Sequence, residues 1–187
     1  MTSGLWDIVV PEVSINMALN PVGGDTDNIA AAAGTTVTPK STTYSYLGPY
    51  STRVEVNADN EGAQFTLSAL TNAIHYVTVR VRGTLPAAWD WSLNATNYNT
   101  PALVSTEGDW SVYGYSFLAA QANGSTRLDL YQNGAGSGDF YVGHVQVEAK
   151  EYATTPIMGD LKNCYWNGAA NKSSSTRPAW DRSGGRV

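Results

Sequence analysis

The chain contains few of the residues from which metal centres and many active sites are built. Its 187 residues include one cysteine and two histidines, and charged residues make up 14%. The single cysteine, Cys164, excludes an internal disulfide and a cysteine-rich metal site. His75 and His144 lie far apart in the sequence and show no metal-ligand spacing, so each is better explained as an ordinary strand residue. We therefore expect no metal, no cofactor and no enzymatic activity.

Positive charge and long apolar runs are also scarce. The formal net charge is −5, and the 11 lysines and arginines form no cluster that would neutralise phosphates, so nucleic-acid binding is not expected. No apolar run reaches the roughly 20 residues of a membrane-spanning helix, and the first residues lack the charged-then-apolar pattern of a signal peptide. We expect no membrane insertion, and synthesis in a cytoplasm.

What the sequence does contain is typical of an all-β protein. Gly, Ser, Thr, Asn and Tyr are abundant, and no long amphipathic helix is visible. From Thr43 onward, short segments with alternating apolar residues are separated by turn signals, which predicts eight or nine strands. Because no helix connects them, the strands must be joined by hairpins or arches, and an antiparallel two-sheet jelly-roll sandwich is the expected fold. The residues predicted to face inward are Val54, Val56, Phe65, Leu67, Val77, Val79 and Val81. Trp89, Trp91 and Leu93 share one face of a further strand, and Leu128 and Leu130 mark the strand before the Gly-rich turn.

The segment Asp139–Glu148 is predicted to be the closing, half-buried strand of the sheet. Strict alternation would place Tyr141, Val145 and Val147 on one face, and the other face would then carry Phe140, His144, Gln146 and Glu148. From Lys150 onward the alternation ends and Pro, Gly, Asn and Ser become frequent. The expected organisation is an extended N-terminal arm at residues 1–13, a jelly roll at 14–149 and an irregular C-terminal arm at 150–187.

Two segments near the N-terminus leave alternatives open. Residues 5–15 are apolar but interrupted by Pro11, which suits a lead-in strand packed on its own domain or an arm laid on a neighbouring subunit. Residues 27–34 are typical either of one or two helical turns, with Asp27 as N-cap and Gly34 just past the end, or of a loop of small residues.

Several motifs resemble, in order, the jelly roll of carbohydrate-binding modules appended to xylanases and cellulases. They are Asn16–Pro21, Tyr50–Val54, a strand ending at Arg82–Gly83, Asp109–Trp110, Leu128–Tyr131 and Asp139–Glu148. In those modules, a carboxylate after the first Asn-Pro turn and an aspartate in the last strand commonly hold calcium. Here Val22–Gly24 and Gly143 supply no side-chain oxygens at these places, so we expect no such calcium site.

The region after the jelly roll is similar to a pattern in minor tail and other virion proteins of tailed bacteriophages. The matching motifs are Tyr152–Pro156, Gly159–Asp160, Cys164–Gly168 and Ser173–Arg177. This resemblance implies a structural protein of a bacteriophage virion, associated with the tail, that contacts other virion proteins and copies of itself. Large apolar residues in the arms would form the assembly interfaces, or fold back on the jelly roll. The candidate interface residues are Trp6, Tyr152, Pro156, Tyr165, Trp166 and Trp180.

Glycan binding at the host surface is the alternative function. Aromatic rings suit stacking on sugars, and Trp89, Trp91 and Tyr98 are the candidate platform. A position in the core or in an interface explains Trp89 and Trp91 better, because both share a strand face with Leu93. A third possibility is an accessory module of a glycoside hydrolase. That chemistry requires two carboxylates facing a cleft, and no motif places Asp90, Glu107 or Asp109 in such a pair.

Overall fold

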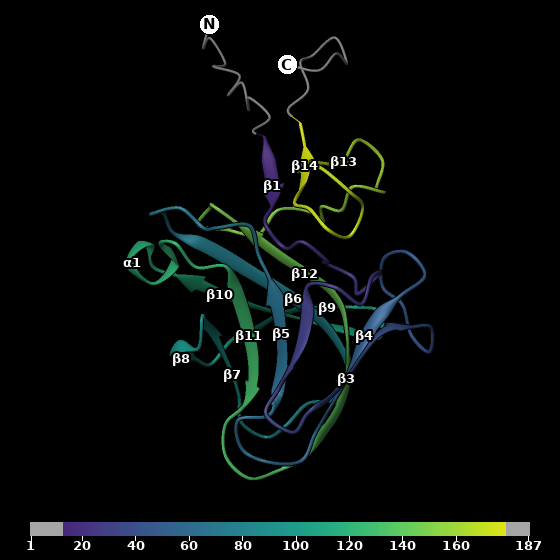
Figure 1. Ribbon diagram of the computed structural model, residues 1–187, viewed down its shortest axis with the longest axis vertical. Coiled ribbons are helices and arrows are strands. Elements are labelled where there is room, and N and C mark those ends of the chain that lie inside the picture. Colours follow the sequence, from purple (N-terminus) through teal and green to yellow (C-terminus); the bar gives the residue numbers. More distant parts are fainter. Residues whose placement is uncertain (1–12, 179–187) are drawn as a thin grey trace, which may run out of the picture.

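Two antiparallel sheets face each other across a common apolar core in the computed structural model, which describes residues 13–178 (Figure 1). Within that range, the larger sheet has six strands and the smaller sheet five. The larger sheet consists, in spatial order, of β3 (Thr36–Ser41), β4 (Ser51–Val56), β12 (Gly138–Glu148), β6 (His75–Thr84), β10 (Trp110–Phe117) and β9 (Ala102–Glu107). The smaller sheet consists of β2 (Ile29–Ala32), β5 (Gly62–Thr66), β11 (Arg127–Gln132), β7 (Trp89–Leu93) and β8 (Thr96–Asn99). The predicted all-β antiparallel sandwich is confirmed.

The core lies between the two sheets and is built from the alternating apolar residues of both. All seven residues predicted to face inward belong to one buried cluster, which also contains Trp89, Trp91, Leu93, Leu128 and Leu130. Burying each large apolar side chain contributes about 1.5–3 kcal/mol. Burial of the apolar residues that alternate along the strands therefore stabilises the sandwich. The single helix in the described range, α1 (Ala119–Ala122), has four residues, and no helix among residues 13–178 is long and apolar enough to cross a membrane.

Strand β12 departs from the prediction because it contains a β-bulge. Val142 pairs with Val81 and His144 with Arg80, which leaves Gly143 as an extra residue. An extra residue reverses the alternation, so Phe140 and Val142 face the core before the bulge and Val145 and Val147 face it afterwards. The predicted faces of Phe140 and Tyr141 were therefore wrong.

The bulge needs glycine for steric reasons. A Cβ atom at Gly143 would lie 2.5 Å from the ring of Trp110 and 2.6 Å from Cβ of Tyr46. These two side chains cover the bulge on the outer face of the six-stranded sheet. Strand β12 is also not half-buried, since both of its faces are covered beyond the bulge.

Residues 29–32 form the edge strand β2, and neither a helix nor a loop. The strand pairs with β5 from Ile29 opposite Phe65 to Ala32 opposite Gly62. Its neighbours Asn28 and Ala33 have φ values of 66° and 51°, in the left-handed region. A right-handed helix cannot continue through such residues, so sheet pairing replaces the predicted helical turns.

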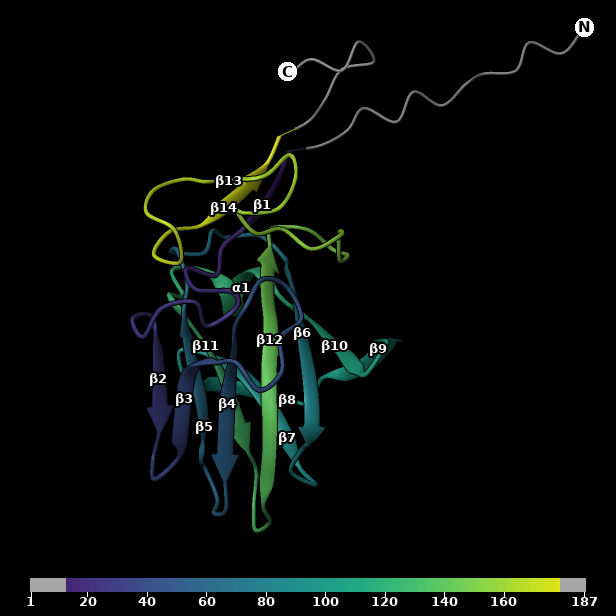
Figure 2. The same ribbon diagram turned by 90° about the vertical axis from the view of Figure 1, so that its right-hand side faces the viewer.

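A third, small sheet lies beyond one end of the sandwich (Figure 2). In it, β1 (Ser14–Asn16) pairs with β14 (Ser175–Arg177), which pairs with β13 (Tyr165–Trp166). The Asn16 side chain joins this sheet to the sandwich. Its amide nitrogen donates to the carbonyls of Val145 at 2.9 Å and Ile157 at 3.1 Å, and its oxygen accepts from the backbone of Val147 at 3.0 Å. The first strand and the C-terminal segment are thereby both attached to β12.

Polar residues on the outer face of β12 bind the C-terminal segment through its backbone. Gln146 accepts a hydrogen bond from the Ile157 backbone at 2.9 Å, and the Glu148 carboxylate accepts one from the Thr154 backbone at 3.1 Å. His144 lies 3.3 Å from the Ile157 carbonyl, which can only accept, so its Nε2 donates. Ile157 and Met158 are buried here. At these two residues the segment folds back on its own jelly roll, which is one of the two alternatives left open above.

Substituting Ile157 by alanine should lower the free energy of unfolding by about 2–4 kcal/mol, because it leaves a cavity under the C-terminal segment. Urea unfolding followed by tryptophan fluorescence measures this. Leu118→Ala is the matched control, since that side chain is exposed, and its effect should stay within about 0.5 kcal/mol. Equal effects of the two substitutions would show that the segment does not pack here in solution.

The protein should lose stability as pH falls below neutrality, because burial and the nearby Arg80 lower the pKa of His144 from 6.5 to about 3. Between these two values the unfolded chain binds a proton that the folded chain does not, so stability is greatest above about pH 6.5 and falls toward pH 3. In His144→Gln, the slope of unfolding free energy against pH between about pH 4.5 and 6 should decrease by up to about 1.4 kcal/mol per unit. Urea titrations at several pH values test this, and an unchanged slope contradicts it.

Candidate functional site

A surface groove of about 200 Å³ lies on the outer face of the five-stranded sheet. Alternation along β11 creates it, because Leu128 and Leu130 face the core while Tyr131 faces outward. Tyr98 reaches the same groove from the edge strand β8. The full lining is Asn60, Tyr98, Tyr131, Gln132 and Asn133.

Two tyrosine rings form the apolar part of the groove. The ring centres of Tyr98 and Tyr131 are 5.6 Å apart, and the ring planes are tilted by 51°. Tyr98 is 50% exposed, whereas Tyr131 is nearly buried and its hydroxyl accepts a hydrogen bond from Gln64 at 3.0 Å. Burial raises the pKa of Tyr131 above its ordinary value of 10, so its hydroxyl proton is retained at neutral pH and available for donation.

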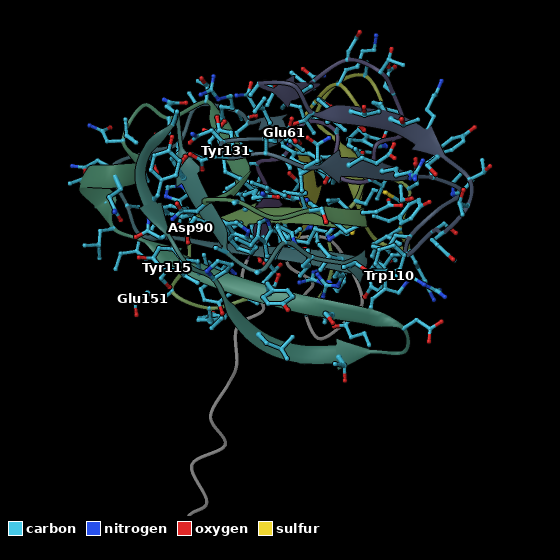
Figure 3. The ribbon with its side chains drawn as sticks, turned by 90° about the horizontal axis from the view of Figure 1, so that it is seen from below. Glu61, Asp90, Trp110, Tyr115, Tyr131 and Glu151 are labelled. Carbon is cyan, nitrogen blue, oxygen red and sulfur yellow. The ribbon has the colours of Figure 1, made fainter. Side chains whose placement is uncertain are left out.

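The polar wall of the groove is held in place by Asp90. This nearly buried carboxylate accepts hydrogen bonds from Thr100 and from the Asn133 side chain, both at 2.6 Å. Figure 3 shows Asp90 and Tyr131 on the same side of the molecule, away from Trp110. Both oxygens of Asp90 are thus occupied by protein donors, and its role at this site is to position Asn133.

Further hydrogen bonds fix the loop that follows β11. The buried amide of Gln132 donates to the carbonyls of Gly134 and Gly136, each at 2.9 Å. From the facing turn, Asp59 accepts from the Gly134 backbone at 2.6 Å, and the Asn60 backbone donates to the Gln132 carbonyl at 3.0 Å. The loop and the turn therefore present Asn60 and Asn133 from a preformed frame.

The lining of the groove is electrically neutral. Its side chains are phenols and amides, and the neighbouring Asp129 is buried and paired with Arg127 at 2.6 Å. Asp129 also accepts from the Ala95 backbone at 2.6 Å. This arrangement suits an uncharged ligand with an apolar face and several hydroxyl groups.

The three aromatic residues predicted as a sugar platform are not brought together. Trp89 and Trp91 lie in the core, with ring centres 5.3 Å apart in edge-to-face contact, as their shared face with Leu93 indicates. Their rings offer no surface to a ligand. The prediction that Trp89 and Trp91 belong to an exposed sugar platform is therefore wrong. Tyr98 lies on the surface beside Tyr131. Sequence reasoning missed Tyr131, although the inward positions of its neighbours in β11 indicate that it faces outward.

The predicted interface residues lie in the C-terminal segment or outside the described residues. Tyr152 and Tyr165 are exposed, and Pro156 and Trp166 are half-buried on this chain. The Trp166 indole donates to Asp160 at 3.0 Å. Trp6 and Trp180 lie outside the described residues. A role of these residues in assembly stays a prediction.

The carboxylates considered for hydrolysis are not paired with one another. Asp90 lies on the five-stranded sheet, while Glu107 and Asp109 lie at the turn between β9 and β10 of the other sheet. There Glu107 binds Arg80 at 3.0 Å and Asp109 binds Arg82 at 3.0 Å. Among residues 13–178, no group of three or more His, Cys, Asp and Glu side chains is placed to hold a metal ion.

Comparison with known proteins relates this fold to carbohydrate-binding modules. No family model and no curated protein sequence matches the chain. Among solved structures, it is similar to the CBM22-1 xylan-binding domain of Xyn10C from Paenibacillus barcinonensis (14% identity, 76% of this chain and 99% of that one, TM-score 0.52). It is also similar to the C-terminal family 22 carbohydrate-binding module of Xyn10B from Clostridium thermocellum (14% identity, 75% and 94%, TM-score 0.50). The chain therefore has the jelly-roll fold of these modules.

Replacing Asp90 by alanine should leave the donors of Thr100 and Asn133 without their acceptor and lower the free energy of unfolding by about 1–3 kcal/mol. Urea unfolding measures the loss. Asp109→Ala serves as the control, because its ion pair on the other sheet is exposed and should contribute less than about 1 kcal/mol. If the two variants are equally stable, Asp90 does not hold the loop.

Proposed function

We propose that this chain is a carbohydrate-binding module and that it binds a neutral glycan in the groove between Tyr98 and Tyr131. The observation that carries the proposal is the pairing of an exposed tyrosine ring with fixed amides in one uncharged groove. Sugar rings present apolar C–H faces and polar hydroxyl edges, which match aromatic rings and amide groups respectively.

The size and the fixed frame of the groove support this function. About 200 Å³ is enough for a single sugar unit. Because Gln132, Asp59 and Asp90 already hold the loop and the turn, little ordering is required on binding. The fold shared with the xylan-binding domains adds support at the level of architecture.

The other functional predictions have less support. A catalytic role is not proposed, because Asp90, the carboxylate at the groove, is engaged with Thr100 and Asn133. Location in a bacteriophage virion, with contacts to other virion proteins or to copies of this chain, stays a prediction that depends on the resemblance of the C-terminal segment. Glycan binding is compatible with it as adhesion to a host surface.

Tyr98→Ala should weaken glycan binding about tenfold, because it removes the exposed stacking surface. Isothermal titration with xylohexaose, cellohexaose and an oligogalacturonate measures affinity, and the neutral sugars should bind while the anionic one does not. Tyr152→Ala is the matched control, since Tyr152 is similarly exposed, at 57%, in the C-terminal segment. No saturable binding of any neutral sugar on a glycan array, or equal losses in both variants, would refute the proposal.

A further inference from the structure

Three amide side chains line the groove, and the nitrogen of each is bound by the protein itself. The Asn60 nitrogen donates to Oδ2 of Asp59 at 2.9 Å. The Asn133 nitrogen donates to Oδ2 of Asp90 at 2.6 Å. Because a carboxylate only accepts hydrogen bonds, these contacts fix which end of each amide is the nitrogen. The oxygens of Asn60 and Asn133 are therefore the ends left for a ligand.

Gln132, the third amide of the lining, follows the same pattern. Its nitrogen donates to the carbonyls of Gly134 and Gly136, each at 2.9 Å. Its buried oxygen has no hydrogen-bond partner among residues 13–178. The amide wall of the groove thus spends its donors on the protein and keeps its acceptors.

The carboxylates behind the wall strengthen this acceptor character. Asp59 and Asp90 each place a negative charge at the nitrogen end of an asparagine, and no lysine or arginine belongs to the lining. A hydrogen bond to a charged acceptor polarises the amide and makes its oxygen a stronger acceptor. A hydroxyl proton of a ligand is attracted to such an oxygen, whereas a group with lone pairs and no proton is repelled.

We propose that the groove selects glycans with free hydroxyl groups, and that Asp59 and Asp90 are the positioning residues that set this selection. The inference rests on the proposed glycan-binding function. A hydroxyl can donate to the oxygens of Asn60 and Asn133. An O-methyl or O-acetyl group at the same place has no proton to donate and leaves these oxygens without a partner. The ligand class is therefore an unsubstituted neutral glycan.

Asp59 gives the sharpest test, because its two oxygens have partners that behave differently. Oδ1 accepts from the Gly134 backbone at 2.6 Å, and Oδ2 accepts from Asn60. In Asp59→Asn, the backbone N–H retains the side-chain oxygen, so the new amide nitrogen faces Asn60. Two amide nitrogens cannot bond to each other, and Asn60 resolves the conflict by turning its oxygen inward and its nitrogen toward the groove. The variant keeps the shape of the wall and replaces an acceptor by a donor.

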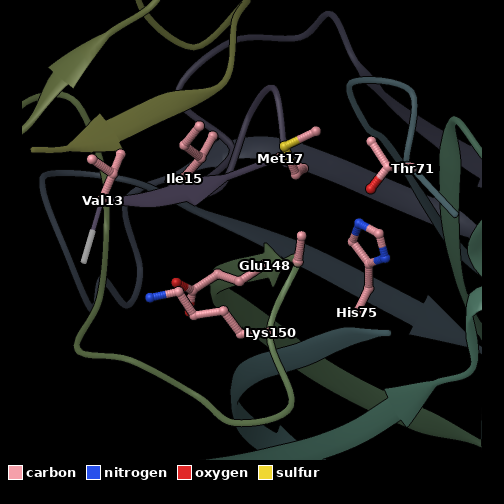
Figure 4. A pocket seen from close by; sticks show the side chains of 8 residues that line it. Val13, Ile15, Met17, Thr71, His75, Glu148 and Lys150 are labelled. Carbon is pink, nitrogen blue, oxygen red and sulfur yellow. The ribbon is translucent and has the colours of Figure 1, made fainter. Parts of the chain in front are cut away.

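The cavity beside β1 has no such amide wall. Its volume is about 230 Å³, and it shares no residue with the groove. Figure 4 shows that its lining includes apolar and charged side chains, among them Val13, Ile15, Met17, Glu148 and Lys150. A change of sugar preference in Asp59→Asn therefore reports on the groove.

Isothermal titration compares xylohexaose and cellohexaose with their partly O-methylated forms. The wild-type chain should bind the unsubstituted sugar at least about tenfold more tightly than its methylated form. In Asp59→Asn this ratio should fall about fivefold, because the ether oxygens then meet a donor. Asp109→Asn makes the same change on the other sheet and should keep the wild-type ratio. Thermal unfolding verifies that both variants are folded.

Asn60→Gly is the second variant and keeps the test decisive if Asp59→Asn does not fold. It removes the oxygen and suits the left-handed backbone at this position, where φ is 62°. The ratio should again fall about fivefold.

The outcomes separate this inference from the proposed function. Equal binding of unsubstituted and methylated sugars by the wild-type chain overturns the inference and leaves glycan binding intact. A ratio that persists in a folded Asp59→Asn also overturns it, because a groove that excludes methyl groups by size alone keeps its preference when its shape is unchanged. Failure of the wild-type chain to bind any of these sugars refutes the proposed function and this inference with it.

Discussion

The one-residue bulge at Gly143 is the constraint on which the two halves of this structure depend. Before it, β12 directs Phe140 and Val142 into the core, and after it Val145 and Val147 continue the same core. The shift also turns a row of polar side chains outward. Without the extra residue, one half of the strand would place its valines in solvent and its polar groups between the sheets. The bulge thus lets one long strand complete the sandwich and bind the C-terminal segment.

The outward-facing polar side chains of β12 explain how the irregular C-terminal segment is attached to this strand, although the segment does not pair with it as a strand. Gln146 and Glu148 bind backbone groups of residues 154–157, and Asn16 binds backbone groups on both sides of the junction. These contacts recognise the main chain, so they constrain its path more than its sequence. Ile157 then supplies the apolar contact that stabilises the arrangement.

Much of the fold could be predicted from the sequence, because a period of two determines which residues face the core. The valines of β6 and the leucines of β11 lie where alternation places them. Alternation could not reveal the bulge, since a single glycine inside a strand has several explanations. It also could not identify β2, where three alanines carry no strong preference and pairing with β5 decides the conformation.

The candidate site was predictable only in part. Tyr98 is a candidate because of its residue type. Tyr131 could have been found from β11, because Leu128 and Leu130 face the core and alternation then directs Tyr131 outward. The sequence does not indicate that these two tyrosines are partners, because Tyr98 and Tyr131 are 33 positions apart and meet only when β7 pairs with both β11 and β8. Asn60 and Asn133 come from two turns whose approach depends on hydrogen bonds that no local motif indicates.

The two tyrosines of the groove differ in how firmly the fold holds them. Tyr131 belongs to β11, which is paired on both sides with β5 and β7, whereas Tyr98 belongs to β8, a sheet edge paired on one side only. Opening an edge strand disrupts fewer hydrogen bonds than opening a central strand. The groove therefore has one side on a central strand and one side on an edge strand, so its width can change at Tyr98 while the core stays intact.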